Sequence, residues 1–593
     1  GLSQLLPLFV VNTPVQQFAK GVMPKGSLRD IFLKYEDNQY AAVADFSLNS
    51  STFYQGIPGV NNFTGNFIYK GPQLRVSLVA KNGVLDFNKH FIKPIHYASL
   101  SSTLDMLIKS DSWQLSAEKI HFSSDVIDIN ADLLLQGAKD KNITMALMAN
   151  ATGGDVTNAQ VFYPQLLMGN DLINYLNKAL IKGQLAQTQV LINGPLNEFP
   201  FKDNQGIFVV DAELVDSTFK FDQQWPAINH FNANLNFTNN QMKITGRGGS
   251  LSGIDIKGVE ATIADLTAEQ RLNIDADIND TLPALITNLM NSSSLADTVG
   301  LTLDHLTIDN TVSGMFHLSV PLNEPDRTVA SGRVDFNRNG LVLRSPHMEF
   351  NQLSGSLFFE NDQLNSEGLQ AFWRGLPLQL QINAEKTALS YVTDIGLNAQ
   401  WKNSDWQPYL PDQLLPYGSG SLDWQGKLQL TMFDQGNFQY GLNIDSDLAN
   451  FHSSLPEPYQ KQKQQKRHLS IEVVGTDKES VINALLDDNL NFYGKLDHQI
   501  IAFRQAHLIL GKEHMLLPTE GFHITTNLEQ VKLDQWYPFI NDIIVSFEQG
   551  QSATQQNTNS LFTFPARIRG DIAKLDILGQ QLNQVAFDFK DDV

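Results

Sequence analysis

The sequence predicts a mainly β fold, in which an elongated, repeating antiparallel sheet carries a few short α-helices. Three observations lead to this prediction: apolar and polar residues alternate in many windows, residues that tolerate tight turns separate such windows, and one strand pattern recurs. Successive side chains point to opposite faces of a strand, so each window places its apolar residues on one face. Sheets covered on both faces would show continuous apolar runs, so antiparallel strands with one polar face are expected.

Six windows show the alternation clearly. In one of them Asn232, Asn234 and Asn236 occupy the positions between the apolar residues, which gives that strand one polar face. The apolar positions of the six windows are Phe231, Ala233, Leu235 and Phe237; Leu272, Ile274, Ala276 and Ile278; Leu378, Leu380, Ile382 and Ala384; Ile395, Leu397, Ala399 and Trp401; Leu428, Leu430 and Met432; and Phe438, Tyr440, Leu442 and Ile444.

Turn residues and a repeat organise these strands. Asn239-Asn240 and Asn339-Gly340 tolerate the positive φ that tight hairpins require, so a hairpin is predicted at each. A strand pattern followed by Gln and an apolar residue also occurs three times with identical internal spacing, which predicts stacked units that extend one sheet along an axis. Its copies are Phe63-x-Gly65-x-Phe67-x-Tyr69 with Gln73-Leu74, Phe231-x-Ala233-x-Leu235-x-Phe237 with Gln241-Met242, and Leu353-x-Gly355-x-Leu357-x-Phe359 with Gln363-Leu364.

Helices are expected to be few and short. The strongest pattern spans residues 171–182, where five apolar residues recur at helical spacing before Gly183. Those residues are Leu172, Ile173, Leu176, Ala179 and Leu180. Further helices are predicted at residues 14–20, 283–290, 481–486 and 406–415. Residues 460–468, which carry four basic side chains, and the polar residues 549–560 are predicted to be loops that do not pack.

Length and composition restrict the fold and the partners. A chain of 593 residues exceeds what one core supports, and we divide it at residues 1–160, 161–297, 298–407 and 408–593. The net charge of −21 opposes binding to nucleic acid, and the absence of cysteine excludes disulfides and thiolate chemistry. No apolar stretch is long enough for a membrane span, and no signal peptide pattern opens the chain, so a targeting segment is expected outside it.

The sequence contains no recognisable catalytic motif. A nucleophile elbow, a zinc-protease helix, a phosphate-binding loop and an EF-hand are all missing. His90 with His96, and Glu513 with His514, lack the spacing that converges on one metal ion. We therefore expect neither an enzyme nor a metal or cofactor site.

The amount of one-sided strand leaves two readings open. Each apolar face can be buried under a second sheet or helices, as in a sandwich. It can instead line an open trough that binds acyl chains, which the shortage of predicted helices favours.

A family resemblance favours the trough. Residues 163–226 and two later segments resemble the periplasmic region of the AsmA-like proteins, of the YhdP type, which are related to TamB. The matching segments are Tyr163-Pro164-Gln165-Leu166-Leu167, Leu176, Ala179, Gly183, Gly194-Pro195-Leu196, Phe199-Pro200-Phe201, residues 206–210, Trp225-Pro226, Pro321-Leu322 and Ser419-Gly420-Ser421-Leu422-Asp423-Trp424.

The resemblance implies a sheet curled into a groove that moves phospholipid between the inner and outer membranes. It also implies a periplasmic location and an inner-membrane anchor outside this chain, with envelope proteins as possible partners. The groove is then predicted to be lined by Phe63, Phe67, Phe231, Leu235, Phe237, Leu272, Ile274, Ile278, Leu357, Phe359, Leu378, Leu380, Ile382, Leu428 and Leu430.

Two other functions remain open at this stage. A scaffold or outer-membrane assembly factor of the TamB type would use the same groove to receive strands of client proteins. A polysaccharide-binding or polysaccharide-cleaving β protein would need clustered exposed aromatic residues and paired carboxylates, whereas the seven tryptophans are scattered along the sequence.

Overall fold

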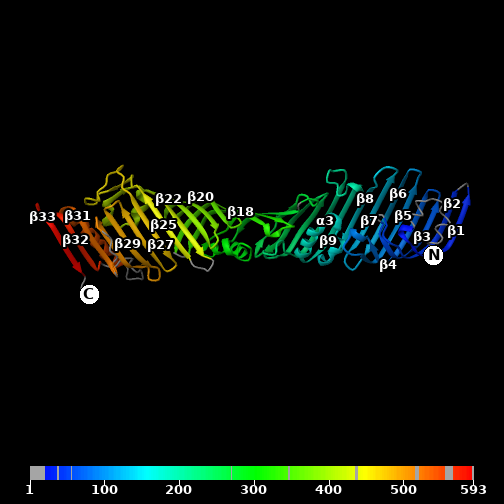
Figure 1. Ribbon diagram of the computed structural model, residues 1–593, viewed down its shortest axis with the longest axis horizontal. Helices are drawn as coiled ribbons and strands as arrows, with labels where there is room; N and C mark the ends of the chain where they lie inside the picture. Colours follow the sequence, from blue (N-terminus) through cyan, green and yellow to red (C-terminus); the bar gives the residue numbers. More distant parts are fainter. Residues whose placement is uncertain are drawn as a thin grey trace. The chain divides into compact units, whose positions relative to one another are not determined.

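The computed structural model describes residues 20–590, except for residues 37–38, 55–56, 269, 345–346, 434–437, 514–517, 519 and 554–564. The chain forms two compact units (Figure 1). Unit 1 comprises Gly1–Asp277 with Met315–Ala330, and unit 2 comprises Ile278–Gly314 with Ser331–Val593. Most of the described chain is β-strand, and 31 strands are assigned to one mainly antiparallel sheet, as the sequence predicts. The division into four segments stays a prediction.

Unit 1 contains the first half of the strands, each paired with its neighbour in the chain from β1 to β12. The strands are β1 (Lys25–Glu36), β2 (Gln39–Ser50), β3 (Gly59–Lys70), β4 (Gln73–Asp86), β5 (Ile95–Ile108), β6 (Ser112–Ser123), β7 (Asp128–Ala138), β8 (Thr144–Thr152), β9 (Leu180–Pro195), β10 (Ile207–Phe219), β11 (Ile228–Thr238), β12 (Gln241–Leu251), β13 (Ile254–Asp255), β14 (Glu260–Ile263), and most of β15 (Arg271–Thr281) and β17 (Val312–Pro321).

Unit 2 contains the remaining strands. They are β16 (Leu306–Ile308), β18 (Val329–Leu343), β19 (Met348–Glu360), β20 (Gln363–Trp373), β21 (Leu376–Lys386), β22 (Ser390–Trp401), β23 (Gly418–Gly420), β24 (Leu422–Phe433), β25 (Phe438–Ser446), β26 (Phe451–Ser453), β27 (Leu469–Thr476), β28 (Glu479–Leu486), β29 (Leu490–Asp497), β30 (Ala502–Gly511), β31 (Gly521–Lys532), β32 (Arg567–Ile577) and β33 (Gln580–Lys590). β23 and β26 form a separate two-stranded sheet.

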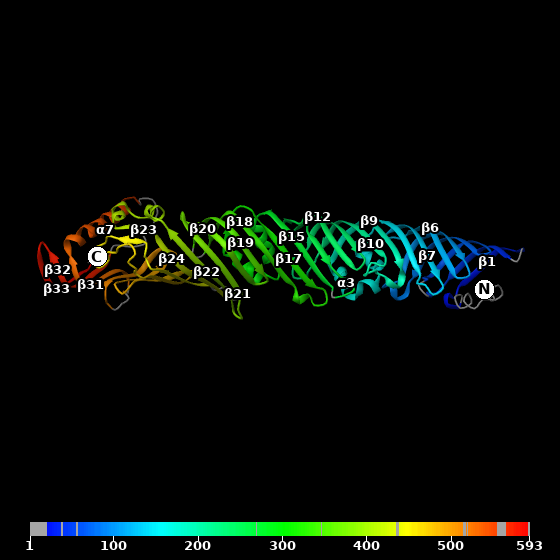
Figure 2. The same cartoon turned by 90° about the horizontal axis from the view of Figure 1, so that it is seen from above.

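Helices are fewer than strands, and Figure 2 shows α3 beside β9 and β10 in unit 1 and α7 beside β31 and β32 in unit 2. Unit 1 has η1 (Asn88–His90), η2 (Val156–Phe162), α3 (Gln165–Ala179), η3 (Leu196–Glu198) and η5 (Pro325–Arg327). Unit 2 has α4 (Pro283–Asn291), the π-helical η4 (Ala296–Gly300), α5 (Leu301–Asp304), α6 (Asn403–Trp406), η6 (Gln407–Tyr409), η7 (Asp412–Tyr417) and α7 (Leu533–Ala553).

The three copies of the predicted repeat fold as equivalent hairpins. In each, two residues separate the last paired position of one strand from the first of the next: Lys70 from Gln73, Thr238 from Gln241, and Glu360 from Gln363. The first turn residues, Gly71, Asn239 and Asn361, all have positive φ. The repeat and the Asn239-Asn240 hairpin are therefore confirmed.

The hairpin predicted at Asn339-Gly340 is wrong. β18 continues through both residues, and its register with β19 shifts on either side of Asn339, which indicates a β-bulge. The Asn339 amide is buried, accepts the backbone N–H of Asn337 at 2.8 Å, and donates to the carbonyls of Asp309 and Thr311 at 2.7 and 3.1 Å. Asn339, which the sequence pattern places in a turn, thus lies inside a strand, where its side-chain amide hydrogen-bonds the backbone of neighbouring segments.

Helix predictions are right in part. α3 spans Gln165–Ala179 and is broken at Gly169, whose φ of 70° and ψ of 164° are not helical. The part after this break agrees with the predicted start near residue 171, whereas Leu180 already belongs to β9. The predicted core residues Leu172, Ile173, Leu176 and Ala179 of α3 are all buried. α4 confirms the helix at 283–290, and residues 406–415 form mainly 3₁₀ turns.

Two further helix predictions have different outcomes. Residues 481–486 lie in β28 rather than in a helix, because periodicity alone cannot separate short apolar strands from helices. Residues 14–19 of the predicted N-terminal helix lie outside the described residues.

The C-terminal part departs most from the predictions. β30, β31 and β32 pair in parallel, although antiparallel pairing is expected throughout. α7, with 21 residues, is missed by the sequence pattern, and its last turns occupy residues 549–553, where a loop is predicted; residues 554–560 lie outside the described residues.

The predicted non-packing loop at 460–468 instead packs against the protein. Lys461 is 2% exposed and Arg467 is 8% exposed. The Lys461 ammonium donates to the carbonyls of Phe451 and Gln462 at 2.7 and 3.2 Å, and Arg467 pairs with Asp487 at 2.7 Å. The hydrogen bonds compensate part of the desolvation of these cations, which a charge count cannot anticipate.

Candidate functional site

The apolar residues of unit 1 share one face of its sheet. Strand register places Phe67 of β3 in a row that crosses eight strands to Phe208 of β10: Phe67, Val76, Leu104, Ala117, Leu133, Leu147, Ile192 and Phe208. A second row runs from Ala212 through Leu235, Ile244 and Ala261 to Ile274. The predicted residues Phe63, Phe67, Phe231, Leu235, Phe237, Leu272 and Ile274 all lie on this face.

Unit 2 repeats the arrangement. One row crosses six strands through Ile382, Ile395, Leu428, Leu442, Val473 and Ile482. The predicted residues Leu357, Phe359, Leu378, Leu380, Leu428 and Leu430 share the face of this row, and Ile278 lies on the same face of β15 as Leu272 and Ile274. We call the apolar side of each unit's sheet its apolar face.

The predicted residues differ in exposure. Seven of them are buried within the protein: Phe63, Phe231, Leu272, Ile274, Leu378, Leu428 and Leu430. The other predicted residues are half-buried: Phe67, Leu235, Phe237, Ile278, Leu357, Phe359, Leu380 and Ile382. The first group is part of the packed core, whereas the second retains apolar surface that a ligand can contact.

A connecting turn and a helix cover part of the apolar face in unit 1. Trp225, in the connection from β10 to β11, contacts Phe316 of β17 with ring centroids 5.5 Å apart. Phe316 faces this side because its neighbour His317 hydrogen-bonds Asp275 on the polar face. α3 lies on the same side, since Tyr175 and Val320 of β17 line one cavity of about 380 Å³. α3 and the connection that contains Trp225 therefore cover part of this face, although helices remain few beside the strands.

Covering elements are also present in unit 2. His305, which follows α5, stacks on Phe438 at 5.8 Å, and Phe438 packs in the cluster of Leu428 and Leu430. Nearer the C-terminus, Trp536 of α7 packs with Tyr459, Leu528 and Ile572 over the same face. Sequence reasoning missed Trp225, His305 and Trp536, since their local sequence does not show which distant strand they contact.

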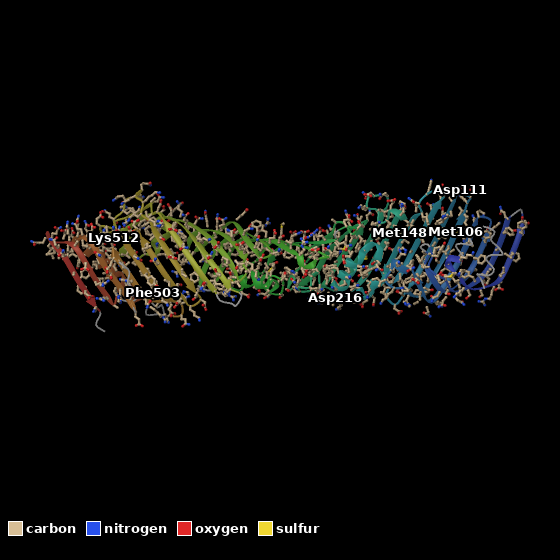
Figure 3. All side chains as sticks on the ribbon, in the orientation of Figure 1. Met106, Asp111, Met148, Asp216, Phe503 and Lys512 are labelled. Atoms are coloured by element: carbon tan, nitrogen blue, oxygen red, sulfur yellow. The ribbon has the colours of Figure 1, made fainter. Side chains whose placement is uncertain are left out.

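The opposite face of each sheet is polar and carries ion pairs between neighbouring strands. Arg75 pairs with Asp105 at 2.7 Å, Lys243 with Glu260 at 2.6 Å, and Lys427 with Asp394 at 2.9 Å. On β10, the hydrogen bond from His230 and the nearby Lys182 lower the pKa of Asp216, a residue labelled in Figure 3. Exposed ion pairs contribute little stability each, so this face serves mainly solubility and strand register.

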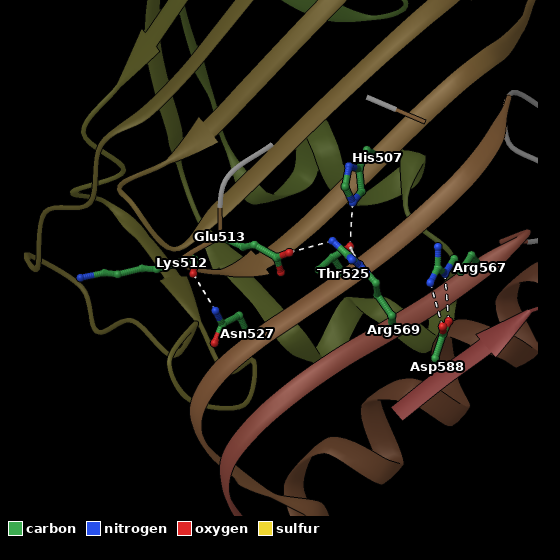
Figure 4. Close-up of polar contacts among 8 residues, drawn as sticks. All are labelled: His507, Lys512, Glu513, Thr525, Asn527, Arg567, Arg569 and Asp588. Atoms are coloured by element: carbon green, nitrogen blue, oxygen red, sulfur yellow. Dashed lines mark hydrogen bonds and ion pairs between the residues drawn. The ribbon is translucent and has the colours of Figure 1, made fainter. Parts of the chain in front are cut away.

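A buried polar network lies on β30–β32 (Figure 4). The Thr525 hydroxyl contacts His507 Nε2 at 2.8 Å and accepts from Arg569 Nε at 3.3 Å, and Arg569 also donates to Glu513 at 2.7 Å. The pKa of His523 is lowered by burial and by the nearby His507, Arg567 and Arg569. The parallel order of β30, β31 and β32 brings His507, Thr525 and Arg569 of this network together from distant parts of the sequence.

No group of three or more His, Asp or Glu side chains that could hold a metal is found among the described residues. His90 lies in η1 and His96 on β5, whereas His514 lies outside the described residues. Of the described helices, none combines the length and apolar content needed to cross a membrane.

The YhdP protein family matches residues 1–592, which is nearly the whole chain. The chain belongs to the YhdP family. A relative from Escherichia coli K12, the intermembrane phospholipid transporter YhdP, is 28% identical over 420 residues. The match covers 71% of this chain and 33% of that relative, so the chain spans about a third of its length.

Membership of the YhdP family confirms the resemblance to AsmA-like proteins that the sequence suggests. The family match extends to residue 592, so it includes the parallel strands and α7 at the C-terminus. Phospholipid transport is the activity named for the E. coli relative.

Proposed function

We propose that this chain moves phospholipid between the inner and outer membranes, with its sheet curled into a groove whose apolar face guides the acyl chains. The observation that carries the proposal is the continuity of apolar rows across successive strands in each unit. Burying one methylene contributes about 0.8 kcal/mol, so such a face can hold a lipid tail while the polar face stays in water. The proposed role is not enzymatic.

The half-buried residues are the proposed contacts with acyl chains. Leu235 and Phe237 in unit 1, and Leu380 and Ile382 in unit 2, keep apolar surface beside their buried neighbours. This surface is supported from within the core by the buried residues Phe63, Phe231, Leu272, Ile274, Leu378, Leu428 and Leu430. The covering segments around Trp225, His305 and Trp536 shield parts of the face from water.

The proposal includes a location in the periplasm, with an inner-membrane anchor supplied by a segment outside this chain. The name of the E. coli relative, an intermembrane phospholipid transporter, supports this placement. Envelope proteins are possible further partners, whereas the net charge of −21 argues against nucleic acid.

Photo-crosslinking tests where lipid binds. A photoreactive amino acid at Leu235 or Leu380 is expected to form adducts with phospholipid in cells. The same amino acid at Asn236 or Gln381, the next residues on the polar face, is the matched control and is expected to give none. Adducts with protein alone from Leu235 and Leu380 would contradict the groove and favour a packed core.

A charge in the path of the acyl chain tests transport. Leu235→Asp or Leu380→Asp should abolish phospholipid transport, because an uncompensated carboxylate at an apolar site costs several kcal/mol. Asn236→Asp and Gln381→Asp add the same charge on the polar face and should leave transport unchanged. Lipid extraction and native mass spectrometry of the purified variants measure the bound phospholipid, and equal amounts in all four variants would refute the proposal.

A further inference from the structure

A trough in unit 2 lies on the face opposite the apolar one. It has a volume of about 1030 Å³ and crosses β20, β21, β22, β24 and β25. Each of the first four strands contributes three consecutive residues, for example Pro377, Leu378 and Gln379 of β21, and β25 contributes Asp445 and Ser446. Because Leu378 belongs to the apolar face, its backbone forms the floor, and the side chains of Pro377 and Gln379 form the two walls. The trough therefore runs across the strands.

One wall is a ladder of amide side chains. Strand register places Gln370, Gln379, Asn398, Gln425 and Asp445 at facing positions on five neighbouring strands. With strands spaced by 4.7–4.9 Å, this row extends over roughly 19 Å. The wall is thus a regular series of polar groups rather than a single binding point.

The other wall combines apolar and acidic groups. Phe372 faces Pro377 at one end, and Gln400 faces Asp423 further along. Asp447 and His468 complete the lining at the far end. A ligand in the trough would therefore contact an apolar surface at one end and carboxylates at the other.

The amides of the trough are not used by the protein itself. Within the described part of the chain, the side chains of Gln370, Gln379, Asn398, Gln400 and Gln425 make no hydrogen bond. Each amide offers two donors and one acceptor oxygen. A ligand rich in hydroxyl or amide groups, which also both donate and accept, would satisfy them.

The charge of the trough excludes anions. Asp423, Asp445 and Asp447 line it, and no lysine or arginine is among the described lining residues. Asp447 pairs with Lys466 at 2.9 Å and Asp445 lies 3.6 Å from His468, so only part of the negative charge is compensated. A phosphate, sulfate or uronate would be repelled.

We propose that this trough binds a neutral glycan chain, which lies across the strands with its hydroxyl groups on the amide ladder. An extended polypeptide fits less well, because peptides recognised by sheets pair with the backbone of an edge strand, whereas this trough crosses the middle of a sheet. The apolar C–H surface of a sugar ring packs on Phe372 and Pro377. The site is independent of the apolar face and of the proposed lipid transport.

Calorimetric titration of the full chain tests this site, with a pentamer of N-acetylglucosamine and a pentamer of glucose as probes. At least one pentamer is expected to bind, and Gln379→Ala combined with Gln425→Ala should weaken that binding roughly tenfold or more. The matched control combines Gln381→Ala on β21 with Gln439→Ala on β25, two exposed glutamines on the same face that do not line the trough.

The titration results distinguish glycan binding in the trough from its absence. Binding that the trough variant weakens and the control variant keeps, with unchanged melting temperatures in both, supports the proposal. Failure of both pentamers to bind at millimolar concentration overturns it. Tighter binding of a sulfated oligosaccharide of equal length, or equal weakening by both variants, also overturns it.

Discussion

At the scale of single residues, Asn339 shows how one amide can fix a strand. It is fully buried on β18, where two of its hydrogen bonds join the bulge to the connection between β16 and β17 and the third is accepted from Asn337 of the same strand. The neighbouring Gly340 N–H donates to the Asp309 carboxylate, which ties the same two segments together. Buried polar groups that lose their partners carry the full cost of desolvation.

Asn339→Ala should lower the free energy of unfolding by roughly 2–4 kcal/mol, because it leaves the Asp309 and Thr311 carbonyls and the Asn337 N–H without a partner. Chemical denaturation followed by circular dichroism measures the change. Asn365→Ala, at an exposed asparagine on β20, is the control and should be nearly neutral. An unchanged midpoint for Asn339→Ala would mean that the bulge does not depend on this amide.

The lowered pKa of His523 predicts that the free energy of unfolding depends on pH. Burial and the nearby His507, Arg567 and Arg569 hold its pKa below the ordinary value. The unfolded chain then binds a proton at this residue more readily than the folded chain, so stability is complete above the unfolded pKa, near 6.5, and falls as the pH decreases toward the folded pKa.

The melting temperature should therefore fall between about pH 7 and pH 5, and His523→Gln should reduce the part of this fall that the histidine causes. Scanning calorimetry over that pH range measures both chains. Parallel profiles for the two chains would show that His523 is not responsible.

At the scale of elements, α3 is the best test of how helices cover the apolar face. Leu176 is 5% exposed, and the next residue, Asn177, is exposed on the same helix. Leu176→Asp should destabilise the protein by roughly 3–5 kcal/mol, because it removes apolar burial and buries a charge. Asn177→Asp should have little effect, and a melting temperature unchanged by Leu176→Asp would mean that α3 is not docked.

α7 offers the corresponding test near the C-terminus. Trp536 packs with Tyr459 at 6.1 Å between ring centroids, and its indole N–H donates to the Glu457 carbonyl at 3.2 Å. Trp536→Ala should cost roughly 3–5 kcal/mol, as measured by denaturant unfolding. Tyr537→Ala changes an aromatic residue that is 66% exposed and should be almost neutral. Similar costs for both variants would contradict the docking of α7 through Trp536.

These elements also show which features a sequence pattern can predict. α3 has an apolar stripe at helical spacing, and its core residues are correctly predicted. β28 was predicted as a helix because a six-residue apolar segment fits either period, and its pairing with β27 and β29 decides the outcome. α7 was missed because Pro538 and the polar residues at its end resemble a loop.

At the scale of the whole molecule, the repeat of one-sided strands predicts an elongated chain. Small-angle X-ray scattering should give a radius of gyration well above the value of about 25 Å expected for a compact protein of this length. A value near 25 Å would contradict the prediction and favour strands folded back on one another.

The sequence by itself determined which residues face which side of the sheet, because alternation with period two is a local property of the backbone. The fifteen predicted groove residues consequently share one face within each unit. Tertiary structure decided which of them are covered: Trp225, His305 and Trp536 reach the apolar face from segments far away in the chain. It also decided the bulge at Asn339, the burial of Lys461 and the parallel order of β30–β32, since each depends on contacts between distant residues that no local pattern encodes.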